Sequence, residues 1–222
     1  MYFKNRADAG QKLAQKLKKY KGRDIVVYAL PRGGVVTANE IAKCLNAPLD
    51  LIITRKIGHP YISEYAIAAV AENGHIVKNE EEVKAVDQVW FRQETKNQRQ
   101  EAKRRRELYL GTKASISPEG KIAILVDDGI ATGLTMRVAI LELKHRHPKK
   151  IIVAVPIAPK DTASQIGAEV DEFVALDIPS MYEFLGGIGA YYDEFLPVED
   201  NEVIKIMKGE VKQNGHLFAA QI

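Results

Sequence analysis

The chain has 222 residues, of which 46% are hydrophobic and 27% are charged, and its formal net charge is +3. This composition is typical of an ordinary globular protein and excludes a disordered chain, a collagen and a disulfide-rich scaffold. So small a net charge does not indicate a nucleic-acid partner. The one cysteine, Cys44, excludes an internal disulfide and indicates a reducing compartment, so we expect a cytoplasmic protein.

Nothing in the hydropathy pattern predicts a membrane segment. The longest apolar run, 151–158, is interrupted by Pro156 and is far shorter than the roughly 20 residues of a membrane helix. The first six residues have no apolar stretch behind their charges, so we expect neither a signal peptide nor a membrane partner.

The first part of the chain reads as alternating helices and strands. Residues 7–20 place apolar side chains at spacings of three and four, which predicts an amphipathic helix. Residues 25–30 form a continuous apolar run, typical of a strand buried on both faces. After the turn at 31–34 we expect a helix over 35–45 and a second buried strand over 49–54. Strand, turn, helix and strand in this order predict a parallel sheet.

The middle of the chain is less regular. Glycine, proline and serine make 55–65 read as a loop, and 66–70 with 75–77 read as a hairpin turned by Asn73-Gly74. A long, highly charged helical segment is predicted over 80–110. Further elements are predicted in alternating order: a strand over 122–126, a helix over 136–145, a strand over 151–155, a helix over 161–167 and a strand over 172–176.

The loop between the strand at 122–126 and the following helix carries the chemistry. Residues 131–135 present successive backbone N–H groups at a helix N-terminus, which is a phosphate-binding arrangement. Thr132 and Thr135 add hydroxyl donors, and Gly133 lets the backbone approach a ligand closely. Two acids directly before the loop suit a sugar diol or a magnesium ion. A ribose 5-phosphate satisfies both halves of the segment.

This segment, Ile-Leu-Val-Asp-Asp-Gly-Ile-Ala-Thr-Gly-Leu-Thr over 124–135, resembles the phosphoribosyl-diphosphate (PRPP) binding motif of type I phosphoribosyltransferases. The alternative is an Asp-Asp turn followed by an ordinary helix cap. No Gly-Lys-Ser/Thr is present, which disfavours a P-loop NTPase. The resemblance implies that PRPP is bound by Asp127, Asp128, Ala131, Thr132, Gly133, Leu134 and Thr135.

The resemblance spans most of the chain. Leu30-Pro31-Arg32-Gly33-Gly34 looks like the family's pyrophosphate loop, which would place Arg32 and Gly33 on the diphosphate; the alternative is a plain turn with a surface arginine. Arg55 and Lys56 stand where the family keeps cations for the leaving pyrophosphate, although two cations at a strand end are common. Residues from 58 to about 72 would be the flexible loop that closes over the reacting centre.

The fold implied is a twisted, mainly parallel sheet flanked by helices, with the flexible loop and a small hood. We expect one domain over 1–222, with a helical insertion at about 80–110 and the hood at about 177–198. The activity implied is Mg²⁺-dependent transfer of the 5-phosphoribosyl group from PRPP to a nitrogenous acceptor, a nucleobase, with release of pyrophosphate. The residues implied in catalysis are Arg32, Lys56, Glu64 and Asp128, with Mg²⁺ held through PRPP and water near Asp127 and Asp128.

The acceptor is less well defined. Ala131 stands where 6-oxopurine enzymes commonly carry an aspartate and adenine-type enzymes an alanine, whereas the aromatic patch after the last strand resembles the hood of the 6-oxopurine enzymes. Tyr182 or Phe184 would stack on a planar base, or else belong to the core. Glu64 is a candidate base or orienting group, or else a solvated carboxylate.

Two other interpretations concern the rest of the chain. The basic run over 99–106 is interleaved with glutamates and is expected to be a solvated helix face and not a nucleic-acid patch. A PRPP- or nucleotide-sensing regulator with the same fold and no catalysis is the alternative function. The partners expected for the enzyme are PRPP, a small acceptor and, as often in the family, a second copy of the chain.

Overall fold

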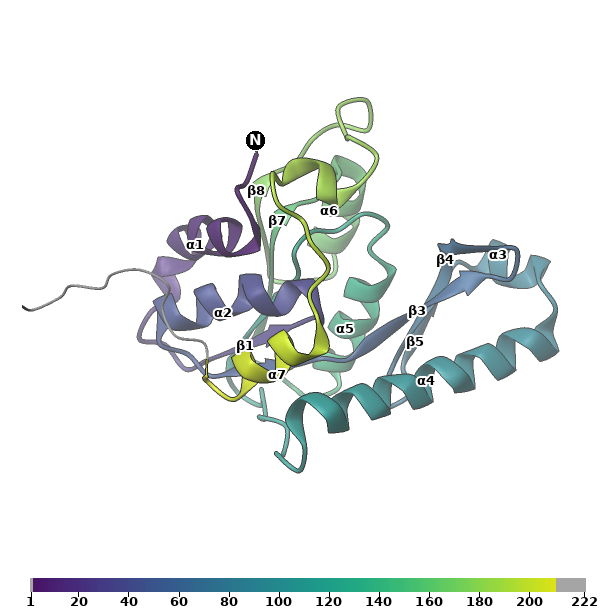
Figure 1. Ribbon diagram of the computed structural model, residues 1–222, viewed down its shortest axis with the longest axis horizontal. Coiled ribbons are helices and arrows are strands. Elements are labelled where there is room, and N and C mark those ends of the chain that lie inside the picture. Colours follow the sequence, from purple (N-terminus) through teal and green to yellow (C-terminus); the bar gives the residue numbers. More distant parts are fainter. Residues whose placement is uncertain (1, 211–222) are drawn as a thin grey trace, which may run out of the picture.

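The protein was analysed as a computed structural model that describes residues 2–210, so Met1 and 211–222 of the predicted domain lie outside the described part. A five-stranded parallel sheet in the order β2-β1-β6-β7-β8 forms its centre (Figure 1). The strands of this sheet are β1 (Ile25–Ala29), β2 (Leu49–Leu51), β6 (Ile122–Val126), β7 (Lys150–Ile157) and β8 (Glu172–Asp177).

Helices cover both faces of this sheet, which is why its inner strands are continuous apolar runs. Along β1, Ile25, Val27 and Ala29 pack towards one helical layer, and the alternate residues Val26 and Tyr28 pack towards the other. The first layer consists of α1 (Arg6–Leu17), α2 (Gly33–Leu45) and α7 (Asp200–Met207), and the second of α5 (Leu134–Lys144) and α6 (Lys160–Gly167). Short 3₁₀ turns are η1 (Lys18–Tyr20) and η2 (Ile188–Tyr191). The predicted α/β fold with a mainly parallel sheet is confirmed.

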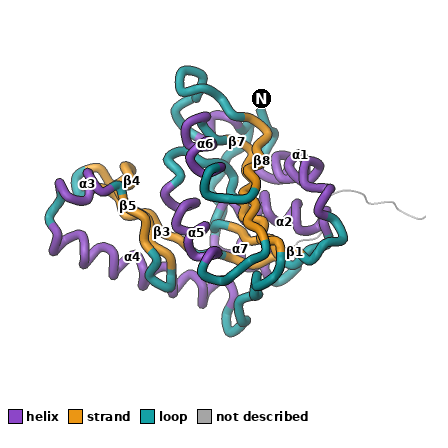
Figure 2. The backbone as a smooth tube through the Cα atoms, turned by 180° about the vertical axis from the view of Figure 1, so that it is seen from behind, coloured by secondary structure: helices purple, strands orange, loops and turns teal. Residues whose placement is uncertain are grey.

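A second unit, here called the arm, projects from the main sheet (Figures 1 and 2). It contains the antiparallel sheet β3 (Thr54–His59), β4 (Ile62–Ala71) and β5 (Ile76–Lys78), with α3 (Glu80–Ala85) and α4 (Gln88–Leu110). The arm has its own apolar cluster, consisting of Ile57, Ile67, Ala68, Val70, Val83, Val86 and Phe91. Ala69 and Ala71 of β4 pack on Val138 of α5, and small side chains let that strand lie close to the helix. The end of α4 also joins the main core through Ala102, Tyr109 and Leu110.

The interpretation of 55–65 as a loop was wrong, because this segment forms most of the hairpin β3–β4. Its outer residues, 61–65, are exposed, so the segment lacks the apolar alternation by which strands are recognised. Gly58 belongs to a bulge in the pairing, where an added Cβ would lie 2.2 Å from the Ser63 carbonyl oxygen. The predicted closing loop from Gly58 to about Glu72 is therefore mostly paired strand, whereas the hairpin of β4 with β5 is confirmed.

Other boundaries differ in smaller ways. The helical segment over 80–110 is two helices, because Asp87 caps a new one by accepting a hydrogen bond from the Trp90 N–H (2.7 Å). The strand predicted over 49–54 ends at Leu51, and α7 was not predicted. The basic run on α4 is only partly solvated: Arg104 is exposed, but Arg106 is largely buried and pairs with Glu72 (2.9 Å). None of the described helices combines the length and the hydropathy that a membrane span requires.

Candidate active site

The strand order places the candidate site. β2 follows β1 on one side, whereas β6, β7 and β8 run outward on the other, so the connections leave β1 and β6 in opposite directions. Ligands of open α/β sheets bind at such a point, outside the carboxyl ends of the two strands. The turn after β1 carries Arg32 and Gly33, and the loop after β6 carries Asp127 and Asp128. The two segments of the predicted PRPP site are thus brought together.

Close packing of glycines against the two acids fixes this junction. A Cβ added at Gly33 would lie 1.9 Å from Asp128 Oδ2, and one at Gly34 would lie 2.9 Å from the Asp127 Cα. Any larger residue would therefore displace the acids. The peptide bond between Pro31 and Arg32 in this turn is cis. Gly33 and Gly34 therefore let the predicted pyrophosphate loop pack directly against Asp127 and Asp128 of the predicted ribose site.

A pocket of about 280 Å³ opens beside the acids. The pocket is lined by the loop from Gly129 to Thr135, which ends at the N-terminus of α5, and by residues of the arm. Gly133 adopts a left-handed conformation (φ 80°) at the helix cap, which a non-glycine residue would adopt only with strain. The arm contributes Lys56, Glu64 and Tyr65 to the pocket, and η2 contributes Ile188. The pocket therefore combines a backbone phosphate cradle with a cation.

The two acids of the loop lie in different surroundings. Burial, reinforced by the neighbouring charge of Asp128, raises the pKa of Asp127 well above its usual range. Asp127 Oδ1 also accepts a hydrogen bond from the Asp128 N–H (2.9 Å). Asp128 is stabilised by Arg6, whose Nε lies 2.6 Å from Asp128 Oδ2. The pair thus combines a buried carboxyl group with a raised pKa and a carboxyl group paired with an arginine.

Sequence reasoning missed the residues that hold Asp128. Arg6, at the start of α1, donates a second hydrogen bond to the Leu196 carbonyl (2.7 Å) and lies over the Phe195 ring, 3.7 Å from its centroid. Tyr192 donates its hydroxyl to the Asp128 carbonyl oxygen (2.6 Å). The chain beginning and the segment after η2 are paired through Phe3 and Tyr192. The contacts of Arg6 and Tyr192 with Asp128 each join residues more than 60 positions apart, so no local sequence pattern predicts them.

The predicted cations lie on two different sides of the arm. Lys56 lines the pocket and pairs with Glu64 (2.7 Å), whose carboxylate is well exposed. Arg55, the preceding residue of β3, points to the opposite face and donates to Gln98 Oε1 of α4 (3.0 Å). Arg32 lies 3.6 Å from Asp200 Oδ1, at the start of α7. Lys56 and Glu64 therefore line the pocket together with the 129–135 loop, whereas Arg32 and Arg55 are not among its lining residues.

The predicted acceptor residues do not line the pocket. Tyr182 is 99% exposed. Phe184 is partly buried and its ring stacks on that of Tyr191 (5.9 Å between centroids). Tyr65 and Ile188 are the large apolar or aromatic side chains of the hairpin and η2 that face the phosphate loop.

The oxygen atoms of Asp127 and Asp128 fit a magnesium ion only if the substrate and water supply its other ligands. Asp127 and Asp128 supply carboxylate oxygens side by side, but Arg6 already occupies one oxygen of Asp128. Among residues 2–210, no group of three histidine, cysteine or acidic side chains is arranged as a metal cage. Mg²⁺ commonly binds through one or two carboxylates together with substrate phosphates and water, which this pair can supply.

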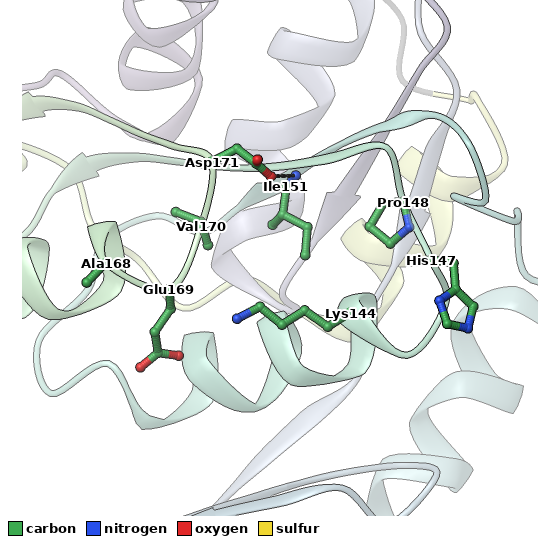
Figure 3. Close-up of a pocket in the computed structure, with 8 residues that line it drawn as sticks. All are labelled: Lys144, His147, Pro148, Ile151, Ala168, Glu169, Val170 and Asp171. Atoms are coloured by element: carbon green, nitrogen blue, oxygen red, sulfur yellow. Dashed lines mark hydrogen bonds between the residues drawn. The ribbon is translucent and has the colours of Figure 1, made fainter.

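Another cavity, of about 460 Å³, lies at the opposite, amino-terminal edge of the sheet (Figure 3). Its two acids are already engaged: Asp171 accepts a hydrogen bond from the Ile151 N–H (2.8 Å), and Glu169 pairs with Arg137 (2.6 Å). The pocket beside the acids, and not this cavity, has the chemistry expected of a phosphate site.

Comparison with known proteins agrees with this geometry. The sequence model of the family described as "Phosphoribosyl transferase domain" matches residues 2–193. The chain belongs to this family. The candidate site of this phosphoribosyl transferase domain coincides with the two loops on which the resemblance rests.

Relatives extend the match over nearly all of the chain. Proteins of two Mycobacterium tuberculosis strains, H37Rv and CDC 1551, whose names assign them provisionally to the phosphoribosyl transferases, are each 37% identical over 207 residues. The match covers 92% of this chain but only 46% of theirs, so the chain spans about half the length of these curated relatives. The crystal structure of TT1426 from Thermus thermophilus is 36% identical, covers 96% of this chain and 100% of that chain, and has a TM-score of 0.78.

Proposed function

We propose that the protein transfers a 5-phosphoribosyl group from PRPP to a nitrogenous acceptor, a nucleobase, in a Mg²⁺-dependent reaction that releases pyrophosphate. The observation that carries this proposal is the pocket lined by the 131–135 loop, Asp127 and the cation Lys56, with Asp128 next to Asp127. A transfer of this kind needs a phosphate cradle, a partner for the ribose hydroxyls and positive charge for the leaving group, and each is present within one cleft.

Each group has a distinct role. The N–H groups and hydroxyls of Ala131, Thr132, Gly133, Leu134 and Thr135 would hold the 5-phosphate. Asp127 and Asp128 would accept hydrogen bonds from the ribose hydroxyls, with Arg6 holding Asp128 in place. Mg²⁺, when bound, would supply positive charge to the diphosphate.

The cations would act on the leaving group. Arg32, the N–H of Gly33 and Arg55 would bind the diphosphate, and Lys56 would approach it from the pocket side of the arm. The Lys56–Glu64 pair is exposed to solvent, so the ion pair itself is worth little. Lys56 can therefore exchange Glu64 for a phosphate oxygen at small cost, which would free Glu64 to accept a proton from the acceptor nitrogen.

The acceptor proposal remains centred on the hood, with a planar base stacked on Tyr182 or Phe184. Tyr182 offers an uncovered ring, whereas the ring of Phe184 already stacks on Tyr191. Substitution of each by alanine separates the two: loss of acceptor affinity with unchanged PRPP affinity supports stacking at that position. Unchanged acceptor affinity in both variants would leave the side of the cleft formed by Tyr65 and Ile188 as the binding surface.

Isothermal calorimetry with PRPP and Mg²⁺ tests the central proposal. Wild type should bind saturably, and Asp128→Asn should bind about tenfold or more weakly, because an ionised partner of the ribose hydroxyls is lost. Lys12→Met is a matched control, since Lys12 pairs with Asp8 on the solvent side of α1 and is remote from the cleft. Pyrophosphate release on addition of purine or pyrimidine bases then tests the transfer. Absence of PRPP binding by folded wild type would refute the proposal, and binding without release for any base would favour the sensing regulator.

A further inference from the structure

One face of α4 carries polar groups that contact β3 and α7. Gln98, Glu101, Arg105 and Tyr109 recur at spacings of three and four, so they form a single stripe along the helix. The stripe meets β3 where Arg55 donates to Gln98 (3.0 Å). It meets α7 where Tyr109 donates its hydroxyl to Asp200 Oδ1 (2.6 Å). Asp200 is also the carboxylate beside Arg32 (3.6 Å).

Three guanidinium groups from three separate elements therefore lie along this stripe: Arg55 of β3 contacts Gln98, Arg105 belongs to the stripe, and Arg32 meets its end through Asp200. Two carboxylates balance them from within the chain. Glu101 Oε1 lies 2.8 Å from Arg105 Nε, and Asp200 lies beside Arg32. Glu101 is shared with Arg104, which points to solvent (58% exposed, against 20% for Arg105).

The cluster carries excess positive charge. Burial lowers the pKa of Arg55, and the charge of Arg105 lowers it further, with a smaller contribution of the same sign from Arg32. Like charges gathered at a partly buried place repel one another unless an anion joins them. Arginine binds phosphate oxygens in a bidentate manner, and several arginines suit a multivalent phosphate better than a monovalent one.

We propose that Arg105 of α4 is a further ligand-binding residue, which binds the diphosphate of PRPP together with Arg32 and Arg55. Glu101 holds Arg105, Asp200 lies beside Arg32 and Gln98 holds Arg55, and these partners give way to the diphosphate when it binds. This inference rests on the proposed function. The helical insertion is thereby part of the substrate site and not only a support for the arm.

The test compares three ligands by calorimetry on the full chain: PRPP with Mg²⁺, pyrophosphate with Mg²⁺, and ribose 5-phosphate, which lacks the diphosphate. Arg105→Gln should weaken PRPP and pyrophosphate binding by about tenfold to a hundredfold, as expected when charge-assisted hydrogen bonds are lost. Ribose 5-phosphate binding should change by less than about twofold. Arg104→Gln is the matched control, because it removes the same charge and the same Glu101 partner from the exposed side of α4.

A second variant keeps the test decisive if Arg105→Gln does not fold. Asp200→Asn removes an internal counterion and should tighten pyrophosphate binding about threefold, a direction that damage to the fold would not produce. Equal effects of Arg105→Gln and Arg104→Gln, or an equal loss of ribose 5-phosphate, would overturn the role of Arg105 while leaving the proposed function intact. Failure of wild type to bind PRPP at all would overturn both. If Arg105→Gln does not fold, weaker or unchanged pyrophosphate binding by Asp200→Asn overturns the inference.

Discussion

The ion pair between Arg6 and Asp128 should be a major contributor to stability as well as to the site. Both side chains are largely buried (11% and 16% exposed), and the two charged atoms lie 2.6 Å apart. Removal of one partner of a buried pair leaves an uncompensated charge and typically costs about 3 to 5 kcal/mol. Because the cleft still admits some solvent at Asp128, we expect the lower end, about 3 kcal/mol, for Arg6→Met. A protein of this size should then lose roughly 6 to 12 °C in Tm.

A double-mutant cycle isolates the pair from the other contacts of Arg6. Arg6→Met also loses the Phe195 ring and the Leu196 carbonyl, but it loses them equally in the presence of Asp128 and of Asp128→Asn. The free energies of unfolding in urea for wild type, the two single variants and the double variant should therefore give a coupling of about 2 kcal/mol. The control Lys12→Met, whose pair with Asp8 is exposed, should cost less than about 1 kcal/mol. A coupling below about 0.5 kcal/mol would refute the reasoning.

Three further predictions concern the charge of Asp127, the arm and the hood. Because the pKa of Asp127 is raised in the folded state, its proton contributes fully to stability below about pH 4, and this contribution falls as pH rises through the folded-state pKa. Asp127→Asn keeps the acceptor for the Asp128 N–H, so the Tm of this variant should decline less than that of wild type from pH 4 to 8. Parallel Tm profiles of the two proteins would contradict this. Phe91→Ala should lower the free energy of unfolding of the arm by about 3 to 5 kcal/mol. Amide hydrogen exchange should therefore accelerate in β3–β5 and not in β1 or β6. Uniform acceleration would show that the arm has no stability of its own. Tyr182→Ala should change the unfolding free energy by less than about 0.5 kcal/mol, whereas Phe184→Ala should cost more because Tyr191 loses its stacking partner; equal effects in urea unfolding would argue against the packing described for Phe184.

The main sheet and the phosphate loop could be predicted because their determinants are local. Strands β1 and β6 are buried on both faces and read as apolar runs, and the acids, the glycine and the threonines of 127–135 lie in one stretch of sequence. The turn at Arg32 could likewise be paired with that loop, since parallel strands bring their carboxyl ends to one edge of the sheet. These features depend on a few neighbouring residues each.

The hairpin and the partners of the acids could not be predicted because their determinants are distant. The outer half of β4 is exposed, and its pairing with β3 rests on backbone hydrogen bonds across a bulge, which leave no hydropathy signal. Arg6 reaches Asp128 across 122 positions of sequence, and only the packed fold brings them together. On α4 the charge pattern is nearly uniform, so the buried Arg105 and the exposed Arg104 look alike until β3 and α7 are in place.

The contact between Arg55 and Gln98 has a consequence for how such proteins can diversify. It joins the place where the chain leaves the main sheet to the place where it returns along α4, so residues 55–98 form an excursion with adjacent ends. This excursion has its own apolar cluster, so it can be exchanged while the sheet and the 127–135 loop stay unchanged, provided that its apolar contacts with Leu134 and Val138 are kept. A chimaera with the corresponding segment of a relative would have the relative's residues at the positions of Lys56 and Glu64, while its 127–135 loop would be unaltered. Divergence in this one insertion could therefore alter what enters the cleft without rebuilding the part that holds the phosphate.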